Sequence, residues 1–335
     1  MRAAFMRQAG VVEVADFPDP VPASGEVLVR MHHASICGSD THVVLDGFHR
    51  PERFGEPGYP GHEGVGVVEE SRSERFAVGD RVLTVPPGWL GACFAELQVV
   101  PEAYLVPVPD GVTLQRGLMA QQLGTTVFAM KKFVRPDVDP ATGTAVVIGA
   151  GSAGLYFVQH LRRLGYAQVV VSEPDRERRA LARRLGATRI LDPTTESLVD
   201  VVAHLTDHVG ADLVVEAAGY DALRAEAIEI VRHSGTVGFF GYPEVSGDAP
   251  YPSFLAFRRN VSIEWVNGAQ LEPGLASFHE AMGLIAAGDI AVDHCLERFL
   301  DLEDVDAAVR LAKRRGEGAA KINLTMPAGR VTSAG

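Results

Sequence analysis

The sequence is poor in cysteine and contains neither a long apolar segment nor an excess of basic residues, and each absence excludes a class of protein. The three cysteines, Cys37, Cys93 and Cys295, are odd in number and far apart, which argues against a disulfide framework and for reduced thiols. No apolar run is long enough to cross a bilayer. The N-terminal stretch MRAAFMRQAGVVEV lacks the features of a secretion signal. A cytoplasmic location without membrane contact is therefore expected.

The charge balance excludes a second class, the nucleic-acid-binding proteins. Acidic residues outnumber basic ones by 43 to 31, the formal net charge is −12, and the basic residues are scattered along the chain. Nucleic acid would be repelled by such a surface. At 335 residues, with 47% hydrophobic residues, the chain exceeds the size at which one core usually keeps growing, which predicts two globular domains.

The texture of the sequence changes near Thr144. From Arg2 to about Val108, short alternating stretches are separated by proline and glycine turns, which is typical of an irregular β-rich domain. Beyond Thr144, apolar runs alternate with helical segments, which predicts a parallel sheet covered on both faces. These runs are TAVVIG, QVVV, TRIL, DLVVEA, TVGFF and VSIEWV. The stretches FHEAMGLIAAGDI, DVDAAVRLAKRR and KINLTM then predict two helices and a closing strand.

A glycine-rich motif, GAGSAG, follows the first of these apolar runs and opens a helical segment. In this strand–turn–helix context a GxGxxG pattern indicates a dinucleotide site. Gly149 permits the tight turn, Gly151 lets the backbone approach a pyrophosphate, and Gly154 allows the helix to pack on the strand. Ser152 and Ala153 begin the helix whose N-terminus faces the anion.

The end of the next apolar run favours NAD as the cofactor. Glu173 lies about 20 residues beyond the glycines, where a carboxylate accepts the ribose hydroxyls of NAD and repels a 2′-phosphate. Arg176, Arg178 and Arg179 follow, and a basic cluster there would instead favour NADP. Most of these arginines are expected on a solvated helix face, and Arg178 is kept as a candidate cofactor-binding residue.

Candidate metal ligands occur in the N-terminal half. ICGSDTH contains Cys37, and PGHEGVGVV contains His62 and Glu63 directly before an apolar run. A lone cysteine or histidine means little, but a thiolate and an imidazole beside a nucleotide fold suit zinc.

The order of these motifs resembles that of the zinc-containing medium-chain alcohol and polyol dehydrogenases. The resemblance is carried by CGSDxH, GHE, GDRV at Gly79–Val82 and GxGxxG, together with VVEAAG at Val214–Gly219 and the terminal GAAKINL, and it covers nearly the whole chain. It implies an α/β fold with a GroES-like β-rich catalytic domain, residues 1–125 and 268–335. A Rossmann domain with a doubly wound parallel sheet, residues 126–267, would interrupt it.

The resemblance also assigns roles to single residues. Cys37 and His62 match the catalytic zinc ligands, and Glu63 matches a carboxylate that lies beside the metal or binds it. Asp40 matches a carboxylate that orients the zinc-binding histidine. Ser39 matches the hydroxyl that contacts the reacting alcohol.

His42 matches the far end of a proton relay that begins at this serine. The implied reaction is the transfer of a hydride between NAD and an alcohol, polyol or sugar-type hydroxyl. The resemblance also implies a homodimer or homotetramer, assembled through the strand VSIEWV.

The sequence departs from the family at two places. The lobe that binds a second, structural zinc through four cysteines has only Cys93 here, so a single catalytic zinc is expected. The position of the third zinc ligand, usually Cys or Glu, is occupied by Gln121 or Gln122, of which the flanking pattern favours Gln121. An amide oxygen is a neutral and weaker donor, so either Glu63 joins the ligands or the site has lost its metal.

Two alternative functions follow from this departure. A chain without zinc would be a metal-free NAD(P)H-dependent reductase, like the quinone reductases of the same superfamily. A chain without catalysis would be a nucleotide-binding protein comparable to the lens crystallins, although such a protein has no reason to keep Ser39 and His42 beside the metal pair.

The identity of the substrate is the least constrained part of the prediction. The loop GFHRPERFGEPG carries His49, Arg50 and Arg53, which could meet a polar substrate, but a solvated loop is the simpler interpretation. Trp89 lies in a proline-rich loop that either walls the substrate site or merely covers apolar surface. Polar side chains near Gln121 favour a polyhydroxylated substrate.

Overall fold

The computed structural model describes residues 1–327, and the chain divides into two units. The first contains Met1–Gly124 and the chain from Ala269 onward, and the second contains Thr125–Gly268. The boundaries expected from the sequence, after residues 125 and 267, each lie one residue away. Residues 328–335 of the expected catalytic domain are outside the described part.

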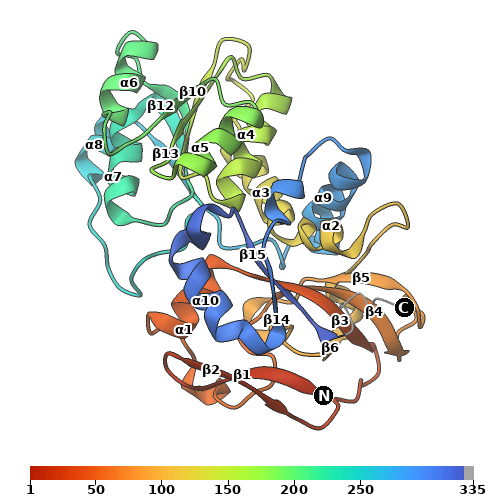
Figure 1. Ribbon diagram of the computed structural model, residues 1–335. Coiled ribbons are helices and arrows are strands. Elements are labelled where there is room, and N and C mark those ends of the chain that lie inside the picture. Colours follow the sequence, from red (N-terminus) through yellow and green to blue (C-terminus); the bar gives the residue numbers. More distant parts are fainter. Residues whose placement is uncertain (328–335) are drawn as a thin grey trace. The chain divides into compact units, whose positions relative to one another are not determined.

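The first unit is built on β-sheets (Figure 1). Strands β1 and β2 form a hairpin, and seven further strands form a sheet in the order β14-β15-β3-β4-β5-β7, with β6 paired to β3. The bounds are β1 Arg2–Gln8, β2 Val11–Asp16, β3 Glu26–Ile36, β4 Glu63–Ser71, β5 Arg81–Thr84, β6 Leu97–Pro101, β7 Leu105–Pro107, β14 Phe299–Asp301 and β15 Ile322–Thr325. The β-rich domain predicted from the short alternating stretches is present, and β14 is a strand that the sequence pattern did not predict.

The register of this sheet determines which residues meet at the ends of its inner strands β15, β3 and β4. β3 is antiparallel to β4, with Ser35 opposite Glu63, and antiparallel to β15, with Ile36 opposite Ile322. Three chain segments therefore reach the same point of the sheet: the end of β3, the start of β4 and the start of β15. Residues at or next to these three strand ends therefore lie close together.

Helices cover parts of this unit. Their bounds are α1 Gly38–Leu45, α2 Leu114–Leu118, α3 Ala120–Phe133, α9 Ala276–Ala287 and α10 Val305–Lys313, and α3 runs across the boundary into the second unit. Short 3-10 turns include η1 Pro51–Arg53 and η2 Gly88–Leu90. The apolar core of the unit combines residues of β3, β4 and α10, for example Val29, Val68 and Val309.

The second unit contains a six-stranded, fully parallel sheet in the order β10-β9-β8-β11-β12-β13. The strands are β8 Thr144–Ile148, β9 Gln168–Ser172, β10 Arg189–Leu191, β11 Ala211–Glu216, β12 Val231–Phe239 and β13 Ser262–Trp265. Numbered along the chain, this is the order 3-2-1-4-5-6 of a doubly wound nucleotide-binding sheet. The predicted α/β fold class is confirmed.

Helices lie on both faces of this sheet (Figure 1). They are α4 Ser152–Leu164, α5 Arg176–Arg184, α6 Leu198–Leu205, α7 Asp221–Ile230 and α8 Ser253–Arg258. All five residues of β8 are buried, as expected for a strand covered on both sides. The strand order reverses between β8 and β11, so the loop after β8 lies at the switch point where such sheets bind ligands. Among the described residues, no helix is long and apolar enough to cross a membrane.

Candidate metal centre and nucleotide site

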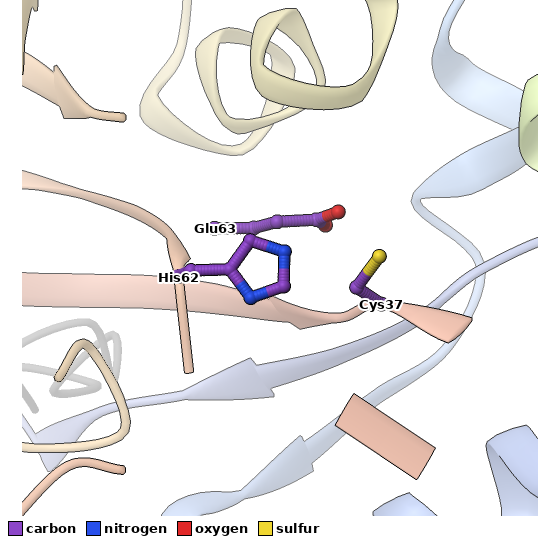
Figure 2. Close-up of side chains that lie close together, drawn as sticks. All are labelled: Cys37, His62 and Glu63. Carbon is purple, nitrogen blue, oxygen red and sulfur yellow. The ribbon is translucent and has the colours of Figure 1, made fainter. Parts of the chain in front are cut away.

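Three potential metal ligands converge where β3 ends and β4 begins. The ligand atoms of Cys37, His62 and Glu63 all lie within 4.8 Å of one another. Figure 2 shows the thiol, the imidazole and the carboxylate turned toward a common point. A thiolate, an imidazole and a carboxylate at such spacing are a donor set that zinc accepts.

Asp40 braces two members of this trio. Its Oδ2 accepts a hydrogen bond from the backbone N–H of Cys37 at 2.8 Å, and its Oδ1 lies 3.0 Å from Nδ1 of His62. The carboxylate is 1% exposed. Because Nδ1 is directed at Asp40, the Nε2 atom of the ring is left to face the trio, which is how a second carboxylate usually orients a metal-binding histidine.

Burial and the neighbouring charges have opposite effects on the pKa of His62. Burial alone would lower the pKa of the imidazole, but the charge and hydrogen bond of Asp40, together with the Cys37 sulfur, raise that pKa well above its ordinary value. In the absence of a cation, a proton on His62 balances the acidic neighbours. A divalent cation would replace that proton and supply the same balance, so these residues fit a metal site.

Lys321 is a member of the site that the sequence analysis did not single out. It directly precedes β15, and its Nζ lies 2.7 Å from Oε2 of Glu63, with both side chains buried. Burial would lower the pKa of this ammonium group, but the charges of Glu63 and Cys37 raise it, so Lys321 remains charged. The only signal in the sequence was its place in GAAKINL, since the pairing depends on the register of β15 with β3.

Cys93 lies behind the trio and is fully buried. Its backbone N–H donates to the carbonyl oxygen of Gly61 at 3.0 Å. Burial raises the pKa of this thiol well above its usual value, and the nearby carboxylates of Asp40 and Glu63 raise it further. Cys93 is thus a buried thiol that stays neutral near the trio.

The two candidate proton-relay residues lie on α1, which begins immediately after Cys37. Ser39 and His42 are three residues apart and therefore neighbours on the helix surface. Nδ1 of His42 is 2.8 Å from Oδ2 of Asp46, and its ring contacts that of Phe48 at 5.3 Å. Ser39 lies two residues and His42 five residues after Cys37, so both belong to about the first one and a half turns of α1.

The candidate glutamine ligand lies on α3. Gln121 is 3% exposed and forms part of the first turn of that helix, within the first unit. Its neighbour Gln122 is half-buried, and the Oε1 atom of Gln122 is enclosed without a hydrogen-bond partner. The trio consists of a thiol, an imidazole and a carboxylate. Each glutamine offers a neutral amide instead.

The glycine motif has the geometry that its sequence predicts. Gly149 has a φ of +96°, which favours glycine. A Cβ on Gly154 would lie 2.0 Å from the carbonyl oxygen of Gly149, whereas a Cβ on Gly151 would meet nothing closer than Arg178 Nη1 at 4.0 Å. Gly154 is thus required for packing, and Gly151 leaves open the space into which a phosphate would fit.

Two candidate cofactor residues adjoin this motif. Glu173 is buried, and its two oxygens accept hydrogen bonds from the backbone N–H groups of Ala150, at 2.7 Å, and Asp175, at 2.8 Å. Arg178 is 8% exposed and approaches Gly151. Arg176, by contrast, is exposed. Arg178 is thus buried, whereas Arg176 lies on the solvated helix face that was expected for most of these arginines.

Glu216 supports the turn at Ala218 and Gly219, and the sequence pointed to it only as part of the motif VVEAAG. It is fully buried, and its Oε1 accepts hydrogen bonds from the backbone N–H groups of Ala218 and Gly219. A Cβ on Gly149 would be 3.2 Å from the Cβ of Ala218. Glu216 therefore holds the turn that packs directly against the glycine motif.

Comparison with protein families agrees with this geometry. Residues 23–110 match the model of the alcohol dehydrogenase GroES-like domain, and residues 153–287 match the model of the zinc-binding dehydrogenases. The first matched region lies within the first unit. The second lies mostly in the second unit, and its last residues, 269–287, belong to the first.

Individual relatives extend the match over nearly the whole chain. The chain is 29% identical to Probable zinc-binding alcohol dehydrogenase Rv1895 of Mycobacterium tuberculosis, over 94% of this chain and 86% of that protein. It is 26% identical to Probable D-xylulose reductase A of Aspergillus fumigatus, over 91% and 92%. The structure of the alcohol dehydrogenase TADH from Thermus sp. ATN1 has a TM-score of 0.81 and 25% identity, covering 97% of this chain and all of that one. The chain belongs to the zinc-containing medium-chain dehydrogenase/reductase superfamily and is an oxidoreductase of the alcohol dehydrogenase type.

Proposed function

We propose that the protein is a zinc-dependent dehydrogenase that transfers a hydride between NAD(H) and the carbinol carbon of an alcohol, polyol or sugar-type substrate. The observation that carries this proposal is the convergence of Cys37, His62 and Glu63 within 4.8 Å. Their bracing by Asp40 and Lys321 supports it further, because a site held by secondary contacts is what a reactive metal requires.

Cys37, His62 and Glu63 would hold a single zinc ion, with Gln121 as a further candidate ligand. When bound, zinc supplies Lewis acidity that lowers the pKa of a coordinated hydroxyl. The ammonium group of Lys321 offsets one of the two anionic ligands. Net positive charge would therefore remain at the metal even with Glu63 among its ligands.

Ser39 and His42 would remove the proton of the substrate hydroxyl. Ser39 Oγ would accept that proton while it releases its own hydroxyl proton toward the imidazole of His42 at the far end of the relay. The Nδ1 atom of His42 lies 2.8 Å from the Asp46 carboxylate. The same carboxylate also pairs with Lys313. Asp46 would thus fix the orientation of the His42 ring, from which the proton would pass to solvent.

NAD is the proposed cofactor. The open space at Gly151 would admit the pyrophosphate at the N-terminus of α4, where backbone N–H groups and the helix dipole favour an anion. Glu173 would repel a 2′-phosphate, while Arg178 would contribute positive charge beside the phosphates. Glu173→Ala should therefore narrow the preference for NADH over NADPH in a fluorescence titration.

The substrate is proposed to be a secondary alcohol or polyol. The curated relatives include a D-xylulose reductase and an L-threonine 3-dehydrogenase, whose names both denote oxidation or reduction at a carbon that bears oxygen. A panel of simple alcohols, polyols and sugars tests this proposal, with NADH absorbance as the readout. Preference for hydrophobic alcohols over polyols would narrow the class to simple alcohols.

The decisive experiment combines metal content with Cys37→Ala. We expect purified, zinc-supplemented protein to contain one zinc per chain, and Cys37→Ala to lose both the zinc and turnover while it still binds NADH. Zinc-free protein that reduces quinones or enones would identify a metal-free reductase. Bound zinc with no turnover on any substrate would identify a nucleotide-binding protein.

A homodimer or homotetramer is proposed as the assembly. β13 is the edge strand of the parallel sheet, and it exposes Trp265, which is 55% accessible. An unprotected edge with aromatic character favours pairing with a second copy. Sedimentation equilibrium distinguishes the two assemblies from a monomer, and Trp265→Lys should weaken either assembly.

A further inference from the structure

Arg53 is buried in a loop where the sequence predicted a solvated side chain. It is 9% exposed and lies at the end of the η1 turn. Its Nη1 donates to the carbonyl oxygen of Gly88 at 3.3 Å, and its Nη2 donates to that of Gly91 at 3.0 Å. A single guanidinium group thus binds both ends of the η2 turn, and we name residues 88–91 the Gly88–Gly91 turn.

Two further contacts fix the guanidinium of Arg53. Its Nε donates to Glu56 Oε2 at 2.6 Å, and its Cζ lies 4.2 Å from the centroid of the Tyr59 ring. The planar fork of arginine satisfies two carbonyls, a carboxylate and an aromatic face at once, and a lysine cannot reproduce that geometry. The guanidinium of Arg53 is therefore occupied by contacts within the protein and is not available to bind a substrate.

The Gly88–Gly91 turn abuts the metal-binding histidine. A Cβ on Gly91 would lie 2.9 Å from the Cβ of His62 and 2.8 Å from the carbonyl oxygen of Gly61. Two backbone hydrogen bonds continue the contact, from Cys93 N–H to Gly61 and from Phe94 N–H to Gly58. One end of the turn is thus seated on the backbone that carries His62.

The tip of the same turn presents apolar side chains. Trp89 and Leu90 are 48% and 45% exposed. Trp89 is two residues from Gly91, so its Cα lies within about 7 Å of the Cα of that glycine. About half of each side chain remains exposed, so burial alone does not explain an indole and an isobutyl group on a turn that contacts His62 through Gly91.

We propose that Arg53 is a positioning residue that fixes the Gly88–Gly91 turn against His62, so that Trp89 and Leu90 form a fixed apolar wall of the substrate site. The wall would contact the C–H face of a substrate whose hydroxyl group is directed at the metal. The inference rests on the dehydrogenase function proposed above and adds to it the residues that select the substrate.

The positioning role is tested by fluorescence, without turnover. The chain has two tryptophans, so in a Trp265→Phe background the emission reports Trp89 alone. We expect Arg53→Ala to lower the anisotropy of Trp89 and to increase its quenching by acrylamide, and Arg53→Lys to have an intermediate effect. Arg50→Ala is the matched control, because Arg50 is exposed in the same loop and binds Tyr59 only through its backbone N–H. Equal quenching in Arg53→Ala and the control overturns the positioning role.

The wall is tested by steady-state kinetics on the zinc-loaded enzyme. Trp89→Ala should raise KM by about tenfold through the loss of apolar contact, with kcat and zinc content unchanged. Arg53→Ala should shift KM in the same direction, and Arg50→Ala should not.

The outcomes separate this inference from the function on which it rests. An active wild-type enzyme whose KM is unmoved in Trp89→Ala and Leu90→Ala refutes the wall alone. Loss of zinc from Arg53→Ala would assign Arg53 to the support of His62 and would also overturn the wall. A wild-type protein that oxidises no alcohol refutes the proposed function, and with it the wall, while the fluorescence result still decides whether Arg53 fixes the turn.

Discussion

The ammonium group of Lys321 lies 2.7 Å from the carboxylate of Glu63, and the two side chains are 4% and 2% exposed. They meet because β3 pairs with both β4 and β15, so that Glu63 and Lys321 flank the same strand end. A buried pair of this kind is expensive to break, since a charge left alone in the interior has no water to solvate it. The pair therefore makes the candidate metal site dependent on β15.

Replacing one partner of this pair should destabilise the first unit strongly. Lys321→Met removes the cation and leaves the Glu63 carboxylate buried without its partner, which typically costs about 3–5 kcal/mol of unfolding free energy. The measurement is urea unfolding with a chelator present, so that no metal replaces the lost charge.

The double variant Glu63→Gln/Lys321→Met is the control for this prediction. It removes both charges, and we expect it to recover most of the stability lost in Lys321→Met. If the single and double variants are equally unstable, the loss reflects packing of the lysine stem and not the ion pair.

Asp40 should determine how tightly the site holds zinc. Asp40→Asn keeps the shape of the side chain but removes the charge that faces His62 Nδ1, and loss of such a partner typically weakens metal affinity by about 10- to 100-fold. Competition with a chromophoric chelator measures this affinity. Asp46→Asn, at the end of the same helix, is the matched control and should bind zinc as the wild type does. Unchanged affinity in Asp40→Asn would show that His62 needs no carboxylate to orient it.

The sequence predicted the parts of the site that lie in contiguous motifs. Cys37 and His62 are recognisable because each lies in a short pattern at a strand end. The glycines of GAGSAG are recognisable because a strand precedes them and a helix follows. The six parallel strands were likewise visible as apolar runs, and the central strand β8, which is buried along its whole length, shows why: a strand covered on both faces is continuously apolar.

The remaining features depend on contacts between distant segments, which no local pattern encodes. Lys321 joins Glu63 only through the register of β15. Arg53 lies in a polar, proline-containing stretch that has the composition of a solvated loop, yet it is buried because Gly88 and Gly91 offer their carbonyl oxygens. β14 was missed because its three residues pair in parallel with β15 and show no alternation of their own.

The glycine motif offers a pair of variants that separate folding from cofactor binding. Gly151→Ala adds a methyl group where the nearest protein atom is 4.0 Å away, and the φ of Gly151, −67°, suits alanine. It should fold normally and lose NADH affinity, because the methyl group occupies the approach of the pyrophosphate. Gly154→Ala places a methyl group 2.0 Å from the Gly149 carbonyl oxygen and should lose both stability and binding. NADH fluorescence and thermal unfolding provide the two readouts, and normal NADH affinity in Gly151→Ala would place the pyrophosphate elsewhere.

His160 couples the stability of the second unit to pH. It is buried on α4, and its Nε2 lies 3.1 Å from Oγ1 of Thr126. Burial, together with a smaller effect of the charge of Arg163, lowers the pKa of His160 to about 4. In the unfolded chain the imidazole takes up a proton near its ordinary pKa, so between that value and about 4 the unfolded state binds more protons than the folded state.

Stability contributed by neutral His160 is therefore complete above the ordinary pKa and is lost as the pH falls toward about 4. Between pH 7 and pH 5 the loss should be about 2 kcal/mol of unfolding free energy. Urea unfolding of a Trp89→Phe background, followed through Trp265, measures this loss in the second unit. His160→Gln should flatten the pH dependence, because an amide side chain gains no proton in either state, whereas His204→Gln, at an exposed position on α6, should leave it unchanged. The same slope in both variants would mean that other groups of this unit carry the pH dependence.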